Sequence, residues 1–256
     1  MSTTASRAVT DNISEQEWKL RTELAACYRL FVKYGWTDLI FTHLSARVPG
    51  VDDQYLINPY GLLFEEVTAS SLLKIDFEGN VISGEHPYND AGHAIHSAVL
   101  KARPDINVAL HSHTRAGMTV STMKCGLLPL TQQAGEIMGN VCYHEYDIAV
   151  GGDEECERLG RDIGDKHAMI MHNHGLLTCA ETVAEAFYLM YTLENACKVQ
   201  VDALASGREL HHTKDSALQM LSAYGRVKPG EIGRSAKLAW SAMIRMLDRQ
   251  DDSYKS

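Results

Sequence analysis

Two His-x-His motifs contain the residues of this sequence with the clearest potential for chemistry. Each pair has one residue between its members and closes a short apolar run: His111 and His113 in the first pair, His172 and His174 in the second. In an extended strand, residues two apart point to the same face, about 6–7 Å from each other. Two imidazoles on one face can occupy neighbouring corners of one metal ion. Among 12 histidines either pair could arise by chance, but two such pairs together favour a divalent-metal site.

Three of these four histidines form the predicted ligand set. A catalytic zinc site usually has three protein ligands and one open position. We choose His111, His113 and His174, because His174 precedes Gly175, where the chain can turn sharply and expose the imidazole. His172 is expected to share the strand face of His174. It is therefore either a fourth ligand or a residue that contacts the substrate or supports the ligands.

Composition and charge exclude several classes of protein. The chain has 256 residues, of which 45% are hydrophobic and 22% charged, as is ordinary for a soluble globular domain. The net charge of −9 provides no basic stripe for nucleic acid, and no apolar run approaches the roughly 20 residues that span a bilayer. Six scattered cysteines and a polar N-terminus without a signal peptide predict a cytoplasmic protein with reduced thiols. We therefore expect a small-molecule substrate, with neither nucleic acid nor membrane as a partner.

Helical and strand periodicities alternate along the chain. Helices are expected over 18–34, 91–102, 116–123, 153–165 and 182–205, and strands over 39–48, 55–57, 72–76, 81–82, 108–113, 140–146 and 168–174. Asp90 is expected to cap the second of these helices, and the chain is expected to pass from His174 through 175–177 into the last one. Several strands are joined by short turns, which favours a mixed or antiparallel sheet covered by helices over a doubly wound parallel fold. The predicted fold class is α/β.

The chain divides into three predicted parts. Residues 1–12 form a disordered N-terminal tail, residues 13–207 form the main domain, and residues 208–256 form a polar helical extension. The extension is expected to pack on the domain or on a neighbouring subunit. His144, His211 and His212 are expected at the surface.

Several motifs at specific spacings resemble one known family. They are His96-Ser97-Ala98-Val99, Arg103-Pro104-Asp105, His111-Ser112-His113-Thr114 and Asn173-His174-Gly175-Leu176. They resemble the class II aldolase and adducin head-domain family over roughly residues 16–206, and the stretch 121–129 looks like the adducin-type branch. The resemblance implies a three-layer αβα fold with a mixed, largely antiparallel central sheet. It also implies zinc on the three chosen histidines and a homotetramer with sites at subunit contacts.

The sequence departs from the sugar-phosphate aldolases of this family in three places. Their Ser-Gly-Asn phosphate loop corresponds to 41–45, where Thr42 and His43 replace Gly and Asn. Their acid/base Glu falls near Gly92, which has no carboxylate. Their catalytic Tyr falls near Gln132 and Gln133, and Gln133 is expected to contact the substrate or support the ligands. These three departures together predict an unphosphorylated substrate.

Proton transfer at such a site then needs other groups. His43 and Tyr60 are expected near the metal, and a histidine can move a proton near neutral pH, whereas a tyrosine needs its pKa lowered. Glu136 is a candidate base, and Asn89 and Asp90 are among the nearest polar replacements for the missing carboxylate. The structural alternatives are a buried, hydrogen-bonded histidine at His43, a packing residue at Tyr60 and a solvated carboxylate at Glu136.

The leading functional hypothesis is a divalent-metal-dependent lyase. It would cleave a C–C bond by retro-aldol chemistry in a hydroxy-carbonyl or hydroxymethyl compound, aromatic ones included, and could release a small aldehyde such as formaldehyde. The cation, Zn²⁺ first and Fe²⁺ or Mn²⁺ as alternatives, would polarise the carbonyl and stabilise the enediolate-like charge. Two alternatives stay open: a non-haem Fe(II) oxygenase on the same ligands, and a non-catalytic adducin-like interaction module. Adducin heads lack the full ligand set, so the three histidines favour an enzyme.

Overall fold

A single sheet with mixed strand directions forms the centre of the molecule. The computed structural model describes residues 13–145, 153–225 and 233–256. The sheet has eight strands in the order β4-β3-β2-β1-β5-β8-β7-β6, and its neighbours are antiparallel except for the parallel pair β6 and β7. The strands are β1 (Leu44–Arg47), β2 (Gln54–Ile57), β3 (Leu73–Asp76), β4 (Val81–Ser83), β5 (Val108–Ser112), β6 (Val141–His144), β7 (Ala168–Met171) and β8 (Gly175–Ala180). The expected mixed, largely antiparallel sheet is confirmed.

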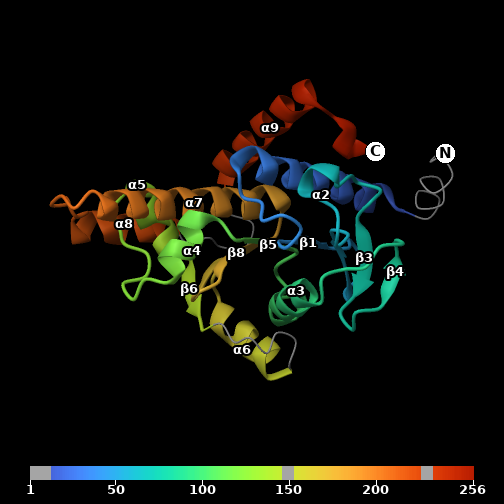
Figure 1. Ribbon diagram of the computed structural model, residues 1–256, viewed down its shortest axis with the longest axis horizontal. Helices are drawn as coiled ribbons and strands as arrows, with labels where there is room; N and C mark the ends of the chain where they lie inside the picture. The colour runs from blue at the N-terminus through green and yellow to red at the C-terminus, as the bar shows by residue number, and fades with distance from the viewer. Residues whose placement is uncertain (1–12, 146–152, 226–232) are drawn as a thin grey trace.

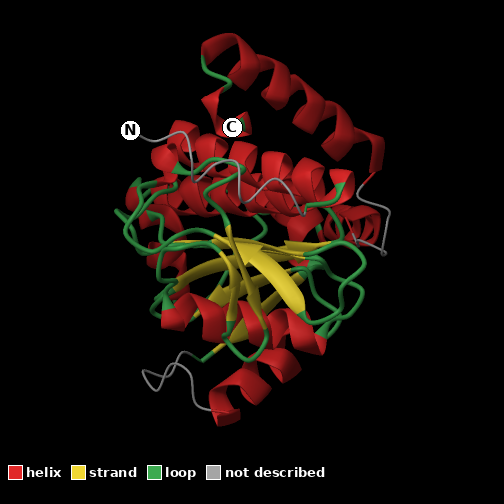
Figure 2. Cartoon of the chain, turned by 90° about the vertical axis from the view of Figure 1, so that its right-hand side faces the viewer, coloured by secondary structure: helices red, strands yellow, loops and turns green. Residues whose placement is uncertain are grey.

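Helices cover both faces of this sheet, which gives three layers (Figures 1 and 2). The helices are α2 (Glu15–Tyr34), α3 (Asp90–Ala102), α4 (Arg115–Ser121), α5 (Gln132–Met138), α6 (Asp153–Ile163), α7 (Val183–Ala205), α8 (Asp215–Gly225) and α9 (Gly233–Gln250). Two short 3₁₀ helices, η1 (Phe64–Glu66) and η2 (Ser253–Lys255), complete the described elements. Helices α3 and α6 pack together below the sheet in Figure 1, whereas α2, α7 and α9 lie above it.

Successive strand residues supply two separate cores. In β5, Leu110 packs into the core under α2, α4 and α7, and Ala109 packs into the core under α3 and α6. In β7, Ile170 packs into the first of these cores and Met169 into the second. Because side chains alternate across a strand, a sheet covered on both faces has apolar residues at nearly every position of its central strands. This explains why the runs before both histidine pairs are continuously apolar.

Local signals account for most element boundaries, with some corrections. Asn89 caps α3 by accepting a hydrogen bond from the Ala91 backbone nitrogen at 3.0 Å, so the expected cap at Asp90 is wrong by one residue. The strand expected over 39–48 is only Leu44–Arg47, because Leu39 has a φ of 47° and lies in a turn that the Phe41 backbone nitrogen closes by donating to the Asp38 carbonyl. The segment after His174 is strand β8 and not a direct lead into α7, and helix α5 was not expected.

The chain beyond α7 packs on the rest of the same chain. Helix α8 contacts α5, and α9 crosses over α2 and α7. The backbone nitrogens of Ala69 and Ser70 donate to the carbonyls of Tyr254 and Ser256, which fastens the C-terminal residues to a loop before β3. Contact of this extension with a neighbouring subunit stays a prediction, and the predicted tail over 1–12 lies outside the described residues. Within the described ranges, no helix combines the length and apolarity needed to cross a membrane.

Candidate metal centre

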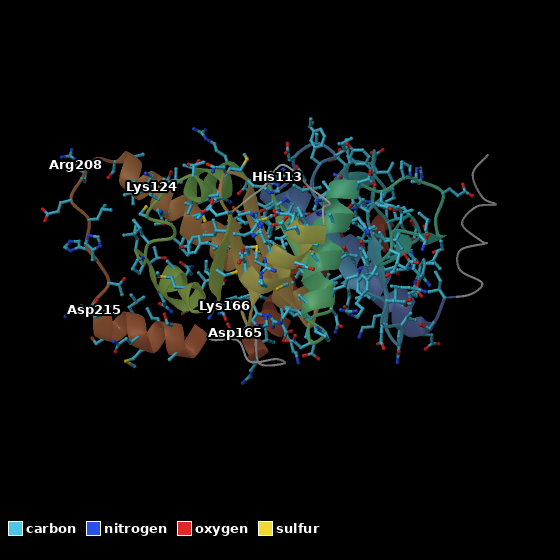
Figure 3. All side chains as sticks on the ribbon, turned by 90° about the horizontal axis from the view of Figure 1, so that it is seen from below. His113, Lys124, Asp165, Lys166, Arg208 and Asp215 are labelled. Atoms are coloured by element: carbon cyan, nitrogen blue, oxygen red, sulfur yellow. The ribbon has the colours of Figure 1, made fainter. Side chains whose placement is uncertain are left out.

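Three histidines from two segments of the chain meet at one end of the sheet. His111 is the last residue but one of strand β5, His113 follows the strand directly, and His174 lies in the turn between β7 and β8. The Nε2 atom of His113 lies 2.8 Å from Nε2 of His111 and 2.9 Å from Nε2 of His174. Among the described residues, these three side chains form a group with donor atoms within 4.8 Å of one another. Figure 3 shows His113 near the middle of the molecule, far from the end that carries Arg208 and Asp215.

The outer hydrogen bonds of two rings fix where their protons lie. Nδ1 of His111 donates to the carbonyl of Leu176 at 2.8 Å, and Nδ1 of His113 donates to Oδ2 of Asp38 at 2.9 Å. A neutral imidazole with its proton on Nδ1 has a lone pair on Nε2. Two lone pairs therefore face each other across 2.8 Å between His111 and His113, an arrangement that a cation between them would stabilise. The donor set fits a bound divalent metal.

The spacing of the three nitrogens is close to what a metal requires. Zinc–nitrogen bonds of about 2.0–2.1 Å in tetrahedral geometry place ligand nitrogens about 3.3 Å apart. The observed separations of 2.8 Å and 2.9 Å are a few tenths of an ångström shorter, so small ring rotations would accommodate the ion. Three imidazoles suit Zn²⁺, Fe²⁺ and other divalent ions, so the ligand type does not identify the metal.

Burial keeps two of these rings in the form that binds metal. It lowers the pKa of His111 well below the ordinary histidine value, with smaller contributions from His174, His113 and His43. Burial also lowers the pKa of His174 to about 4, helped by His113 and His144. Metal binding requires neutral imidazole, so these two rings need lose no proton near neutral pH.

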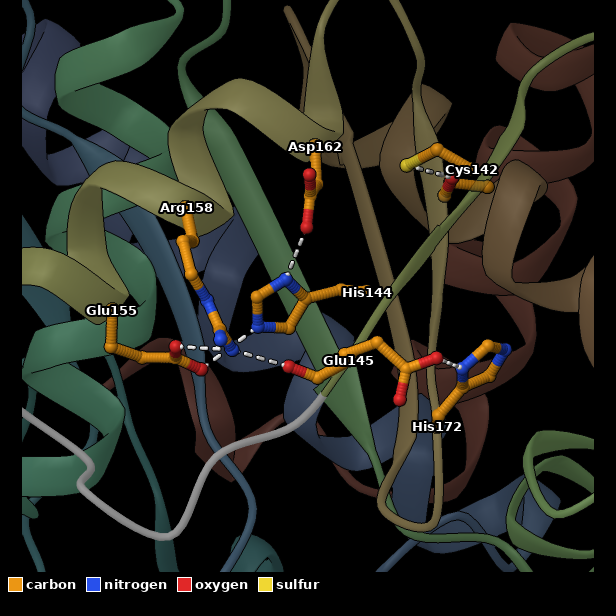
Figure 4. A network of polar contacts seen from close by, with 8 residues as sticks. Cys142, His144, Glu145, Glu155, Arg158, Asp162 and His172 are labelled. Carbon is orange, nitrogen blue, oxygen red and sulfur yellow. Dashed lines mark hydrogen bonds and ion pairs between the residues drawn. The ribbon is translucent and has the colours of Figure 1, made fainter.

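The second histidine pair differs from the expected strand end. Met171 pairs with Gly175 across a hairpin, and the three residues between them form a turn in which Asn173 has a φ of 57°. His174 points to the cluster, whereas Nδ1 of His172 lies 2.6 Å from Oε1 of Glu145 (Figure 4). The expectation that His172 and His174 share a strand face is wrong, because a turn does not alternate its side chains as a strand does.

Gly175 is required by a close approach of two strands. A Cβ atom at this position would lie 2.4 Å from the carbonyl oxygen of Ser112 and 3.1 Å from Cδ2 of His113. The sharp turn that the sequence placed at Gly175 is made by Asn173 instead. The missing side chain at Gly175 thus lets β8 bring His174 against the end of β5.

His43 lies beside the cluster, directly before β1. Its buried ring stacks on that of His111 with centroids 5.1 Å apart, and its Nδ1 lies 2.8 Å from Nε2 of His96. Nδ1 of His96 in turn lies 2.5 Å from the hydroxyl of Ser45. Burial, followed by the neighbouring His96, lowers the pKa of His43 well below its usual range. A Cβ atom at Gly92 would lie 2.5 Å from the His43 ring, so His43 fills the space where a side chain at position 92 would begin.

The other polar candidates lie at or beside the start of α3. Asn89 caps α3, and its Nδ2 lies 3.5 Å from the carbonyl of Phe41. Asp90 is exposed in the first turn of α3. The backbone nitrogen of Tyr60 donates to the carbonyl of Pro87 at 2.8 Å, which places Tyr60 next to the start of the same helix.

Glu136 and Gln133 lie elsewhere, on α5. They line a pocket of about 510 Å³ together with Gln132, Tyr188 and Leu221. Oε1 of Glu136 accepts a hydrogen bond from Nε2 of Gln132 at 2.8 Å. None of the three cluster histidines lines this pocket, and α5 packs mainly against α8 and α7, so the structure does not group Glu136 or Gln133 with the cluster.

Sequence reasoning missed several residues around the cluster. Asp38 follows the end of α2 in a loop without a recognisable pattern, and only the fold brings it to His113. His144 is buried and not exposed as expected, since its ring nitrogens lie 2.7 Å from Asp162 and 2.9 Å from Glu155 of helix α6 (Figure 4). Arg158 of the same helix donates to the carbonyl of Glu145, so α6 is fastened to the end of β6 next to the second histidine pair.

Relatives of this chain carry aldolase and adducin names. A protein of Pseudomonas aeruginosa named "Putative aldolase class 2 protein" is 47% identical over 249 residues, covering 95% of this chain and 94% of the relative. Mouse alpha-adducin is 44% identical over 191 residues, which cover 73% of this chain and 26% of the adducin.

Solved structures of similar fold point the same way. An aldolase II superfamily protein from Pseudomonas syringae matches 97% of this chain and 99% of its own, with a TM-score of 0.91 and 42% identity. The L-fuculose 1-phosphate aldolase from Glaciozyma antarctica matches 97% of this chain and 98% of its own, with a TM-score of 0.77 and 26% identity. The family described as Class II Aldolase and Adducin N-terminal domain matches residues 22–201. The chain therefore belongs to the class II aldolase and adducin family.

Proposed function

We propose that this protein is a divalent-metal-dependent lyase that cleaves a C–C bond in an unphosphorylated hydroxy-carbonyl or hydroxymethyl compound, aromatic ones included. The observation that carries the proposal is the convergence of His111, His113 and His174, two of them with lone pairs aimed at each other. Zn²⁺ is the first candidate for the metal, ahead of Fe²⁺ and Mn²⁺. A homotetramer in the cytoplasm belongs to the same proposal.

The residues around the cluster would divide the work of such a reaction. A bound divalent cation would supply Lewis-acid stabilisation of the negative charge that develops beside a carbonyl as the C–C bond breaks. Asp38 and the Leu176 carbonyl orient the rings of His113 and His111. His43 stacks on His111 and stands where Gly92 leaves no carboxylate, so it is our candidate for passing on the proton that is moved, and its lowered pKa would make it release that proton readily. Tyr60 is the second candidate.

The preference for a substrate without phosphate rests on the loop before β1. Thr42 and His43 replace the small residues of the family's phosphate loop, and both are buried against the protein. Their bulk leaves less room for a phosphate than glycine would. His172 is two residues from His174 in the same turn, and Asn89 contacts the loop that leads to His43, so we propose them as substrate contacts.

The test combines metal analysis with a matched pair of substrates. Protein purified without oxygen should contain about one divalent metal per chain. It should release an aldehyde from hydroxymethyl or hydroxy-carbonyl compounds and turn over their phosphorylated counterparts more slowly. His174→Ala should abolish this activity. Full activity in that variant, or a preference for the phosphorylated compound, would contradict the proposal.

A non-catalytic, adducin-like role is the second candidate, and the 44% identity to mouse alpha-adducin favours it. This role predicts no stoichiometric metal, and it predicts that His111→Ala changes assembly alone. Oxygen uptake coupled to substrate loss, with iron in the purified protein, would instead indicate an Fe(II) oxygenase on the same ligands.

A further inference from the structure

A buried carboxylate lies behind the strand that carries two of the three histidines. Glu194 is on α7, and its side chain is fully buried. Its Oε1 accepts a hydrogen bond from the hydroxyl of Ser112 at 2.9 Å. The hydroxyl of Thr114 lies 2.7 Å and 2.8 Å from its two oxygens. Glutamate is almost never fully buried without a charged partner, so this position needs an explanation.

The strand itself connects this carboxylate to the cluster. Residues 111 to 114 alternate between the two faces, so His111 and His113 turn toward the α3 side while Ser112 and Thr114 turn toward α7. Glu194 therefore holds from behind the same four residues that present two ligands in front. The Thr114 hydroxyl also accepts from the backbone nitrogen of Gly117 and caps α4. One carboxylate thus ties a strand end, a helix start and α7 together.

The buried environment of Glu194 disfavours the negatively charged form of its carboxylate when no cation is bound nearby. Burial raises the pKa of Glu194, and the hydrogen bonds from Thr114 and Ser112 and the charge of Lys198 lower it only in part. In front of the strand, three neutral imidazoles would carry no negative charge, and Asp38, which contacts His113, would offset only part of the double charge of a divalent ion. Opposite charges separated by protein and little water attract strongly, because the interior screens them weakly.

We propose that Glu194 is a positioning residue for the metal centre, which orients His111 and His113 through Ser112 and Thr114 and supplies a buried negative charge to a neutral ligand set. This inference rests on the metal of the proposed function. It predicts that Glu194 contributes to metal affinity although it lies on the face of the sheet opposite the ligands. A purely structural Glu194 would contribute to folding and leave metal affinity unchanged.

The experiment compares Glu194→Gln with a matched control on the same helix. Glu185 is also buried, but it lies nine residues earlier on α7, about 13.5 Å from Glu194 along the helix axis. Each protein is stripped with a chelator and titrated with Zn²⁺ in competition with a chromophoric chelator, and then with Co²⁺ to record the absorption of the bound ion. Glu194→Gln should bind Zn²⁺ about 10–100-fold more weakly and shift the Co²⁺ spectrum. Glu185→Gln should match the wild type in both.

Two further measurements separate positioning from folding. Stripped Glu194→Gln should melt within about 3 °C of the stripped wild type, because removing a buried charge offsets the weaker hydrogen bond. Ser112→Ala keeps the charge and removes one donor, so it should weaken Zn²⁺ binding less than Glu194→Gln does. Thr114→Ser keeps the donor and should bind as the wild type.

The outcomes distinguish this inference from the proposed function. Zn²⁺ affinity of Glu194→Gln within twofold of the wild type, with an unchanged Co²⁺ spectrum, would overturn the positioning role and leave the metal centre standing. A wild-type protein that binds neither ion would overturn both. If Glu194→Gln does not fold, Ser112→Ala decides, and unchanged Zn²⁺ affinity in that variant would count against the inference.

Discussion

The two histidine pairs of this protein have the same spacing and opposite geometry. His111 and His113 end an extended strand, so both rings reach the cluster from one face. His172 and His174 lie in a hairpin turn, where the left-handed backbone of Asn173 sends one ring to Glu145 and the other to the cluster. A spacing of two therefore means a shared face only while the backbone stays extended.

The largest effect should come from the second pair, whose two histidines differ in whether they reach the cluster. His174→Ala removes a ligand, so we expect the loss of Zn²⁺ affinity to exceed the roughly 10–100-fold that a supporting residue typically contributes. His172→Ala should bind Zn²⁺ within about threefold of the wild type, because its ring is held outside the cluster by Glu145. Competition with a chromophoric chelator measures both. Equal losses in the two variants would show that His172 is a ligand after all.

The sequence predicts the cluster better than its surroundings, for a physical reason. Strand periodicity and family motifs are local patterns, so they identify His111, His113, His174 and the largely antiparallel sheet. Asp38 reaches His113 only through a loop that starts after α2, and no local pattern encodes that approach. Glu194 had one signal, since polar residues on both faces of an otherwise apolar strand require a polar partner behind it. The turn at His172 had a weaker signal, an asparagine two residues before a glycine.

Acid should destabilise the metal-free protein, because buried histidines in and beside the cluster take up protons when the chain unfolds. Burial lowers the pKa of His174 to about 4 and that of His96 to about 3, so the folded state holds fewer protons than the unfolded state between these values and about 6.5. Stability is then full above about pH 6.5 and falls as the pH drops toward 3–4, by about 1.4 kcal/mol per pH unit for each group. Urea unfolding at pH 7.5, 6 and 5 measures this, and His96→Gln should reduce the slope. A stability that does not change over this range would contradict it.

One histidine of each pair contacts a carboxylate, and replacing these two carboxylates should give smaller effects on metal binding that can be compared directly. Asp38 accepts from Nδ1 of His113 at 2.9 Å, and Glu145 lies 2.6 Å from Nδ1 of His172. Asp38→Asn should weaken Zn²⁺ binding by about 10-fold or more, because the ring of a ligand loses its orienting charge. Glu145→Gln should leave Zn²⁺ affinity unchanged within about twofold. Equal effects of the two substitutions would mean that Glu145 and His172 belong to the metal centre.

The smallest effect should come from the residue that makes the two pairs different. Asn173 has a φ of 57°, a conformation that costs most L residues about 1–2 kcal/mol and glycine almost nothing. Asparagine tolerates it better than most, so Asn173→Gly should fold as stably as the wild type, while Asn173→Ala should lose about 1 kcal/mol and melt about 2–4 °C lower. Both variants keep the backbone hydrogen bond from residue 173 to Ser121, which leaves the backbone conformation as the main difference between them. Thermal melting of the stripped proteins measures the effect, and the same melting temperature for Asn173→Ala and Asn173→Gly would show that the turn does not depend on the left-handed residue.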